Sequence, residues 1–133
     1  MADGARSDAG PAIRATAMAA DADPYGKIFV GWLVGQMALA AGSVVSRYSG
    51  ARAPVVGADG FSFITPVSVG DEVSFYAEVV AVGRTSMTVA VECWRRDRHA
   101  EEAERAAAGK FTLVALDDDG RPRPVLEKGN SRG

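Results

Sequence analysis

The feature that most restricts how this chain folds is a run of 19 residues without a single charge, residues 28–46. Its length is close to the roughly 20 residues that a membrane-spanning helix needs, and Gly31 and Gly35 have the G-x-x-x-G spacing of packed membrane helices. A helix lying on a protein surface would need a polar face, which the run lacks. The other interpretation is a helix buried on every side within a fold.

Alternation of apolar and polar residues in the second half of the chain favours the buried helix. Strands are predicted at residues 13–18, 55–64, 73–79, 87–93 and 111–116. A tight reversal is expected at Gly83 and Arg84, and turns at residues 69–72 and 117–120. Residues 99–108 have helical propensity, but two long antiparallel strands need a short connection, so a charged hairpin loop is expected there. The uncharged run is then the only helix that such a sheet could wrap around, which predicts an α+β fold.

Composition limits the classes of protein that this chain can belong to. The 133 residues suit one domain, predicted at residues 12–125 between a flexible leader (1–11) and a flexible tail (126–133). The net charge of −2 gives no basic footprint for nucleic acid. Cys93 and His99 are the only residues of their kinds, so neither a disulfide nor a Cys/His metal cluster is expected. The sequence contains neither a Walker nor a Rossmann glycine pattern, so a nucleotide cofactor is not expected. We therefore expect a cytoplasmic protein without metal, cofactor or membrane partner.

Several short segments match a known family in order and spacing. They are Gly26 with Ile28 and Phe29, Gly31 with Trp32, Gln36 with Met37, and the segments at 63–66, 69–71, 82–86 and 119–122. With these segments the chain, from about residue 14 to 125, resembles the short single-domain bacterial acyl-CoA thioesterases of the hotdog superfamily. The resemblance implies a long central helix gripped by a curved antiparallel sheet of about five strands. It also implies a homodimer, or a trimer of dimers, with acyl-CoA bound between subunits.

Thioester hydrolysis needs a polarised carbonyl, and the start of the uncharged helix offers one way to achieve it. Free N–H groups at a helix N-terminus stabilise a developing oxyanion. Gly31 matches the family glycine whose N–H is placed at the thioester oxygen, while Val30 replaces a second glycine of the family pattern. The alternative is that Gly31 is present only for close packing.

Thioester hydrolysis also needs an activated water, and here the sequence departs from the family pattern. The helical aspartate that acts as the catalytic carboxylate in the family is replaced by Ala38, and another family acid is replaced by Lys27. A family asparagine that faces the helical acid across the interface is replaced by Asp23. The resemblance therefore predicts Asp23 as the general base, with Gln36 helping to orient water or acyl group. The alternative is that Asp23, before Pro24, caps the helix region.

A second carboxylate, Asp59, stands in an apolar predicted strand, where a charge is costly without a task or a partner. It is a further catalytic candidate, and a structural ion pair is the alternative. Lys27 is a possible partner for Asp59 or Asp23, and it could also contact a phosphate of CoA or an acidic acyl group.

Cationic and hydroxyl side chains supply candidates for binding CoA. Arg84, Thr85 and Ser86 match a turn that lies near the nucleotide in the family, and such groups suit phosphate oxygens. Lys110 and Arg121 are further candidates. The alternative for each of them is a solvated surface charge.

Three functions remain open from the sequence. The leading prediction is an acyl-CoA thioesterase. The replacements at Ala38 and Lys27 favour instead a non-catalytic protein that binds acyl-CoA or another apolar ligand. A hotdog hydratase or dehydratase would need a histidine paired with an acid, and His99 stands among charges in an expected loop.

Overall fold

The computed structural model describes residues 10–125 and contains one long helix and five strands. The helix is α1 (Val30–Ser49), preceded by a short 3-10 helix, η1 (Ala19–Asp21). The strands are β1 (Ile13–Thr16), β2 (Val55–Phe63), β3 (Glu72–Val82), β4 (Ser86–Arg96) and β5 (Glu104–Val114). The predicted tail, and the predicted leader apart from Gly10 and Pro11, lie outside the described residues, and the domain boundaries stay a prediction.

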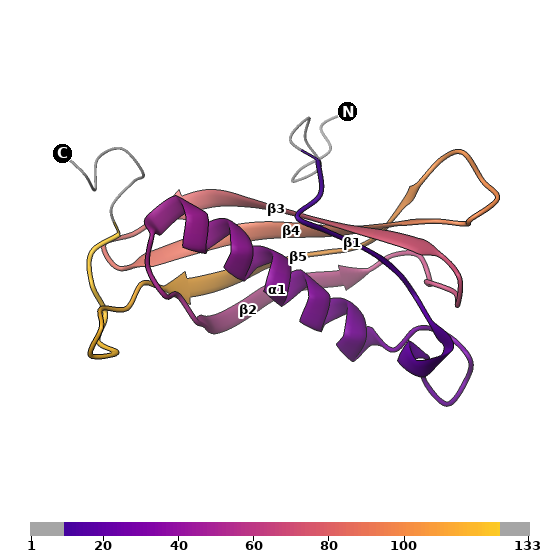
Figure 1. Cartoon of the computed structure of the whole chain (residues 1–133), viewed down its shortest axis with the longest axis horizontal. Coiled ribbons are helices and arrows are strands. Elements are labelled where there is room, and N and C mark those ends of the chain that lie inside the picture. Colours follow the sequence, from indigo (N-terminus) through magenta and orange to yellow (C-terminus); the bar gives the residue numbers. More distant parts are fainter. Residues whose placement is uncertain (1–9, 126–133) are drawn as a thin grey trace.

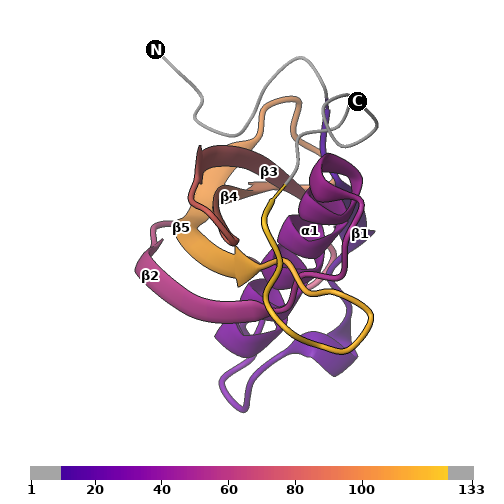
Figure 2. The same cartoon turned by 90° about the vertical axis from the view of Figure 1, so that its left-hand side faces the viewer.

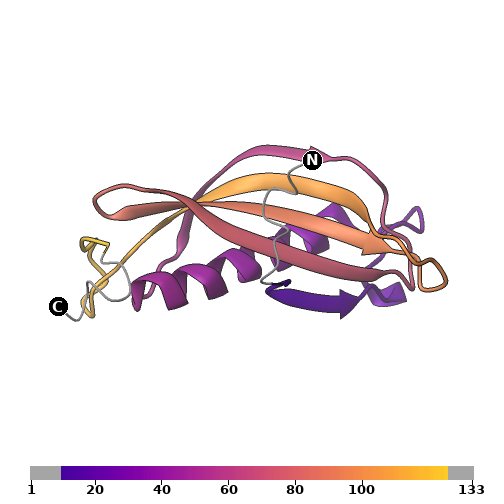
Figure 3. The same ribbon diagram turned by 90° about the horizontal axis from the view of Figure 1, so that it is seen from above.

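All five strands form one antiparallel sheet in the order β1-β3-β4-β5-β2. The helix α1 lies along one face of this sheet (Figure 1), and the sheet curves around it (Figure 2). From above, β3, β4 and β5 run as two successive hairpins beside the helix (Figure 3). The α+β prediction of one central helix and about five antiparallel strands is confirmed.

The core lies between α1 and the concave face of the sheet. Apolar side chains at alternate positions of β3, β4 and β5 point toward the helix, as the two-residue period of a strand requires. Among them Phe75 is fully buried, and its ring meets Trp32 edge to face with 6.0 Å between centroids. Met37 and Leu33 extend from the facing side of α1 into this layer. These contacts fix the helix across the sheet.

The expectation that α1 is buried on every side is wrong. One side of the helix packs on the sheet, while the other is open and carries mainly small residues, with Leu39 63% exposed among them. A single sheet covers only one side of a helix, and the open side needs no charged side chain because Gly31 and Gly35 expose little apolar surface and Ser43 carries a hydroxyl. No helix within the described residues combines the length and the apolar character needed to cross a membrane.

The connection between β4 and β5 is a loop, as expected, but it is shorter than the sequence indicated. The loop covers residues 97–103, and β5 begins at Glu104 rather than at Phe111. Cross-strand pairing outweighs the helical propensity of this alanine-rich segment. Arg95 pairs with Glu104 in the ladder, and its guanidinium binds that carboxylate at 2.6 Å and the buried Asp71 at 2.8 Å.

Strand edges without a partner within residues 10–125 occur in three places, one of which is the outer side of β1. β1 covers β3 only at Glu72–Phe75, so the half of β3 that approaches Gly83 is open. β2 forms the opposite border of the sheet and is also open along one side. Open edges are available for pairing with a second chain.

Burial of the Cys93 thiol is expected to make stability fall at alkaline pH. Cys93 is fully buried on β4, and burial raises its pKa from 9.0 to about 12. Between these values the unfolded chain loses the thiol proton and the folded chain keeps it, so this group lowers the unfolding free energy as pH rises, by at most about 1.4 kcal/mol per pH unit. Urea unfolding of the native chain and of Cys93→Ala at pH 8, 9.5 and 11 measures this contribution. Equal pH slopes for the two chains would contradict it.

Candidate active site

The start of α1 presents backbone N–H groups that have no partner among the described residues. Phe29 is the N-cap residue and makes no side-chain capping bond, while its carbonyl accepts from the N–H groups of Trp32 and Leu33 at 3.0 and 3.3 Å. The N–H groups of Val30 and Gly31 donate to no acceptor within residues 10–125. Such groups carry the positive end of the helix dipole and suit a developing negative charge.

Gly31 also has a steric reason to be glycine. A Cβ atom at this position would stand 2.9 Å from Cδ2 of the Phe29 ring and closer still to Cε2. The ring of Phe29 therefore lies directly over the helix start. The free N–H and the close packing coincide at Gly31, so the two interpretations of this glycine are compatible.

Asp23 organises the turn that leads into α1. Its Oδ1 accepts hydrogen bonds from the N–H groups of Tyr25 and Lys27 at 2.8 and 3.1 Å, and its own N–H donates to the Lys27 carbonyl at 2.6 Å. The N-cap of α1 itself is Phe29, so Asp23 stabilises the preceding turn rather than capping the helix. Within the described part of the chain, Oδ2 of Asp23 makes no hydrogen bond.

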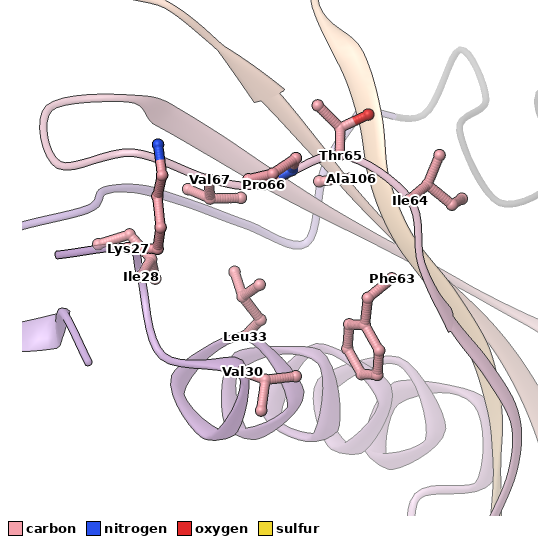
Figure 4. Close-up of a pocket in the computed structure, with 10 residues that line it drawn as sticks. All are labelled: Lys27, Ile28, Val30, Leu33, Phe63, Ile64, Thr65, Pro66, Val67 and Ala106. Atoms are coloured by element: carbon pink, nitrogen blue, oxygen red, sulfur yellow. The ribbon is translucent and has the colours of Figure 1, made fainter. Parts of the chain in front are cut away.

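Two pockets lie on either side of the helix start. The pocket of about 410 Å³ contains Asp23 and is lined by Ala20, Asp21, Ala22, Asp23, Pro24, Phe29 and Trp32. The pocket of about 240 Å³ is mainly apolar and is lined by Lys27, Ile28, Val30, Leu33, the segment 63–67 and Ala106 (Figure 4). The sequence did not indicate this second pocket, although the apolar run after β2 was a visible signal. Gly31 stands between residues that line the two pockets.

Gln36 does not join Gly31 within one chain. It lies five residues further along α1, which at about 100° per residue turns it to another side of the helix, and it lines neither pocket. Ala38 is half-buried and packs against the core.

Asp59 lies away from the helix start. It pairs across β2 and β5 with Lys110, on the face of the sheet opposite to that of the core residue Phe111. Its side chain is exposed, so the expected cost of a charge in an apolar strand is absent. Within residues 10–125, neither Asp59 nor Lys27 takes part in an ion pair, so the possible pairing of Lys27 with Asp59 or Asp23 is not formed within one chain.

Most of the CoA-binding candidates gather at the far end of the molecule. Arg84, Thr85 and Ser86 form the β3–β4 turn, where the Thr85 carbonyl accepts from the Ala115 N–H at 2.9 Å. The segment after β5, in which Asp117 accepts a hydrogen bond from the Arg121 N–H at 3.0 Å, lies near the same end of α1 (Figure 1). The 20 residues of α1 separate this end from Gly31 by roughly 30 Å.

Lys110 and His99 lie away from both ends of α1. Lys110 is exposed in the middle of β5, and His99 is exposed in the β4–β5 loop, where its N–H donates to the Asp97 carboxylate at 2.9 Å. No acid in the described residues forms an ion pair with His99, so the geometry gives no support to a hydratase site. Within residues 10–125, no group of three or more His, Cys, Asp and Glu side chains could hold a metal ion.

Comparison with known families decides the identity of this fold. The sequence pattern of the thioesterase superfamily matches residues 25–102, more than half of the chain. The chain belongs to the thioesterase superfamily. The match covers α1, β2, β3 and β4, so the thioesterase pattern includes the helix start and part of the lining of each pocket, while Asp23 and Ala106 lie outside it.

Individual members of the thioesterase superfamily are similar over nearly the whole chain. An uncharacterized acyl-CoA thioester hydrolase of Zymomonas mobilis is 49% identical over 122 residues, which cover 92% of this chain and 82% of the relative. One similar solved structure is that of a hexameric broad specificity acyl-coenzyme A thioesterase with one aspartate changed to alanine. Its TM-score is 0.85 and its sequence is 33% identical, and the match covers 90% of this chain and 88% of that chain. A hexameric hotdog fold thioesterase of Campylobacter jejuni has a TM-score of 0.83 and 30% identity, covering 92% and 94%. The hotdog prediction is confirmed.

Proposed function

We propose that this protein is an acyl-CoA thioesterase, which hydrolyses acyl-CoA to a free acid and CoA. The observation that carries the proposal is the uncapped start of α1 in a thioesterase fold, where the Gly31 N–H is free and flanked by two pockets. A thioester oxygen that accepts this hydrogen bond gains stabilisation as negative charge develops on it. The name and the solved structures of the relatives support the same chemistry.

Asp23 is the proposed general base. Two N–H groups hold its Oδ1, which leaves Oδ2 to accept a proton from water. The water oxygen then forms a bond to the thioester carbon, and the carbonyl electrons move onto the oxygen near Gly31. Collapse of this intermediate breaks the carbon–sulfur bond and releases the CoA thiolate, which takes up the proton held by Asp23 and so restores the carboxylate. The carboxylate of Asp23 would in this way take over the role of the catalytic aspartate that the family has at the position of Ala38.

The proposed active unit is a homodimer, further assembled as a trimer of dimers, in the cytoplasm. In one chain, most of the CoA-binding candidates lie at the opposite end of α1 from Gly31, so one extended substrate reaches both more readily across a subunit contact. The open side of α1 and the open edge of β2 offer surfaces for that contact. Gln36 and Asp59 would reach the site only from the partner subunit. The hexameric relatives support this assembly.

A thiol-release assay with short, medium, long and aromatic acyl-CoA substrates tests the proposal. Turnover on any of them, with one free acid formed for each thiol, is the expected result. Measurable CoA binding without turnover would favour the second candidate, a non-catalytic acyl-CoA-binding protein, which the half-buried and apolar Ala38 supports.

Arg84→Ala is expected to raise KM for acyl-CoA about tenfold and leave kcat within about twofold. The exposed guanidinium has no ion pair within residues 10–125 and would lose a charge-assisted bond to phosphate, which lies far from the reacting carbon. Steady-state kinetics with one good substrate measures both constants. Arg47→Ala, which removes an exposed arginine of α1, is the control. An unchanged KM in Arg84→Ala would remove this residue from the CoA site.

A further inference from the structure

The apolar pocket beside the start of α1 has fixed walls. On one side the Ile28 N–H donates to the Val67 carbonyl at 3.0 Å, which ties the entry of the helix to the segment after β2. On the other side the N–H groups of Ile64 and Thr65 both donate to the Ala106 carbonyl, at 2.7 and 3.3 Å. The space of about 240 Å³ between these walls is therefore already formed and suits a short acyl chain.

Among the residues that the structure describes, Lys27 supplies the only charge in the lining of this pocket. The side chain runs along the rim beside Val67 (Figure 4), while the other lining side chains are apolar except that of Thr65. The backbone of Lys27 is held at both its N–H and its carbonyl by Asp23, so the side chain starts from a fixed position. Its ammonium group forms no hydrogen bond and no ion pair within residues 10–125.

An apolar pocket with one unneutralised cation at its rim fits a particular ligand chemistry. The apolar walls favour methylene groups, and the ammonium favours an anion at the end of them. Among residues 10–125, no carboxylate lines the pocket to compete for Lys27. Val30 and Leu33 lead from the pocket to the helix start, where the thioester carbonyl is expected to lie near Gly31.

We propose that this pocket selects short acyl groups that end in a carboxylate, with Lys27 as the residue that recognises the acid. The proposal rests on the proposed thioesterase function and names its substrate class. The acyl chain lies along Val30 and Leu33, the thioester carbonyl stays at the free N–H of Gly31, and the terminal carboxylate accepts hydrogen bonds from the Lys27 ammonium.

Binding of two thioether analogues that cannot be hydrolysed tests the selection apart from the chemistry. S-(4-carboxybutyl)-CoA carries the acid, and S-pentyl-CoA has the same number of carbons in its chain without it. Calorimetric titration of the full chain is expected to give about tenfold tighter binding of the carboxylated analogue. Lys27→Met should abolish this preference, and Lys27→Arg should retain it. Arg98→Met removes an equal charge from the β4–β5 loop and should leave the preference unchanged.

Two results would overturn the inference. One is equal affinity of the native chain for both analogues. The other is equal weakening of both analogues in Lys27→Met, because that pattern would assign Lys27 to the shared CoA moiety. Thiol release from glutaryl-CoA and pentanoyl-CoA is measured beside the titrations. A retained binding preference without any thiol release would refute the proposed function while supporting the selection of the acid.

Discussion

Asp23→Asn is expected to lower kcat at least about 100-fold and to leave the melting temperature unchanged. Asparagine keeps an oxygen in the place of Oδ1, so the N–H groups of Tyr25 and Lys27 keep their acceptor and the turn before α1 is preserved. What the substitution removes is the negative charge that takes the proton from water, and general base catalysis typically contributes 10²- to 10⁴-fold. Thiol-release kinetics together with a thermal unfolding curve separate the two roles of this residue.

Two further variants sharpen this test. Asp97→Asn changes a carboxylate that accepts one backbone N–H in the β4–β5 loop, and it should leave kcat unchanged. The double variant Asp23→Asn with Ala38→Asp restores the acid and amide of the family pattern and should recover part of the lost turnover. Native-like kcat in Asp23→Asn alone would limit Asp23 to its structural role in the turn.

Phe75→Ala is expected to lower the free energy of unfolding by about 3–5 kcal/mol. Phe75 is fully buried on β3, and its ring fills the layer between the sheet and Trp32 of α1. Removing the ring leaves a cavity that the neighbouring elements close only in part, because β1 and β4 hold the backbone of Phe75 on both sides. Urea denaturation at a fixed protein concentration measures the change, since subunit association also contributes to apparent stability.

The matched control for Phe75→Ala is Glu78→Ala. Glu78 lies on the same strand with an exposed side chain, so its loss should change the unfolding free energy by no more than about 0.5 kcal/mol. A cost below about 1 kcal/mol for Phe75→Ala would mean that the helix and the sheet are not packed together around this ring.

Elements with a clear pattern of apolar and polar residues were predicted well from the sequence. The alternation at residues 73–79 and 87–93 falls inside β3 and β4, and the uncharged run became α1 with limits shifted by two or three residues. The segment that became the start of β5 was not predicted as strand, because its alanines and glutamates favour a helix in isolation. Pairing with β4 across the sheet, which is not visible in the local sequence, makes it a strand.

The candidate site was predicted only in part from the sequence. Gly31 was expected at a helix start and lies there, because the limits of the uncharged run could be read directly. Asp59 was expected to carry a costly charge because its segment is apolar. The sequence does not reveal that β2 is an edge strand, where that side chain is exposed beside Lys110. The pocket at Lys27 likewise depends on Ala106, which no local pattern connects to α1.

Phe29 provides no side-chain cap for α1, and a substitution that supplied one would raise stability but lower activity. A serine, threonine or aspartate there would accept a bond from an N–H of the first turn and typically add about 1 kcal/mol of stability. The same bond would use up a donor that the proposed mechanism reserves for the substrate. A search for more stable variants of this enzyme would therefore favour substitutions at residue 29 that reduce its turnover, and this position is best kept unchanged in such a search.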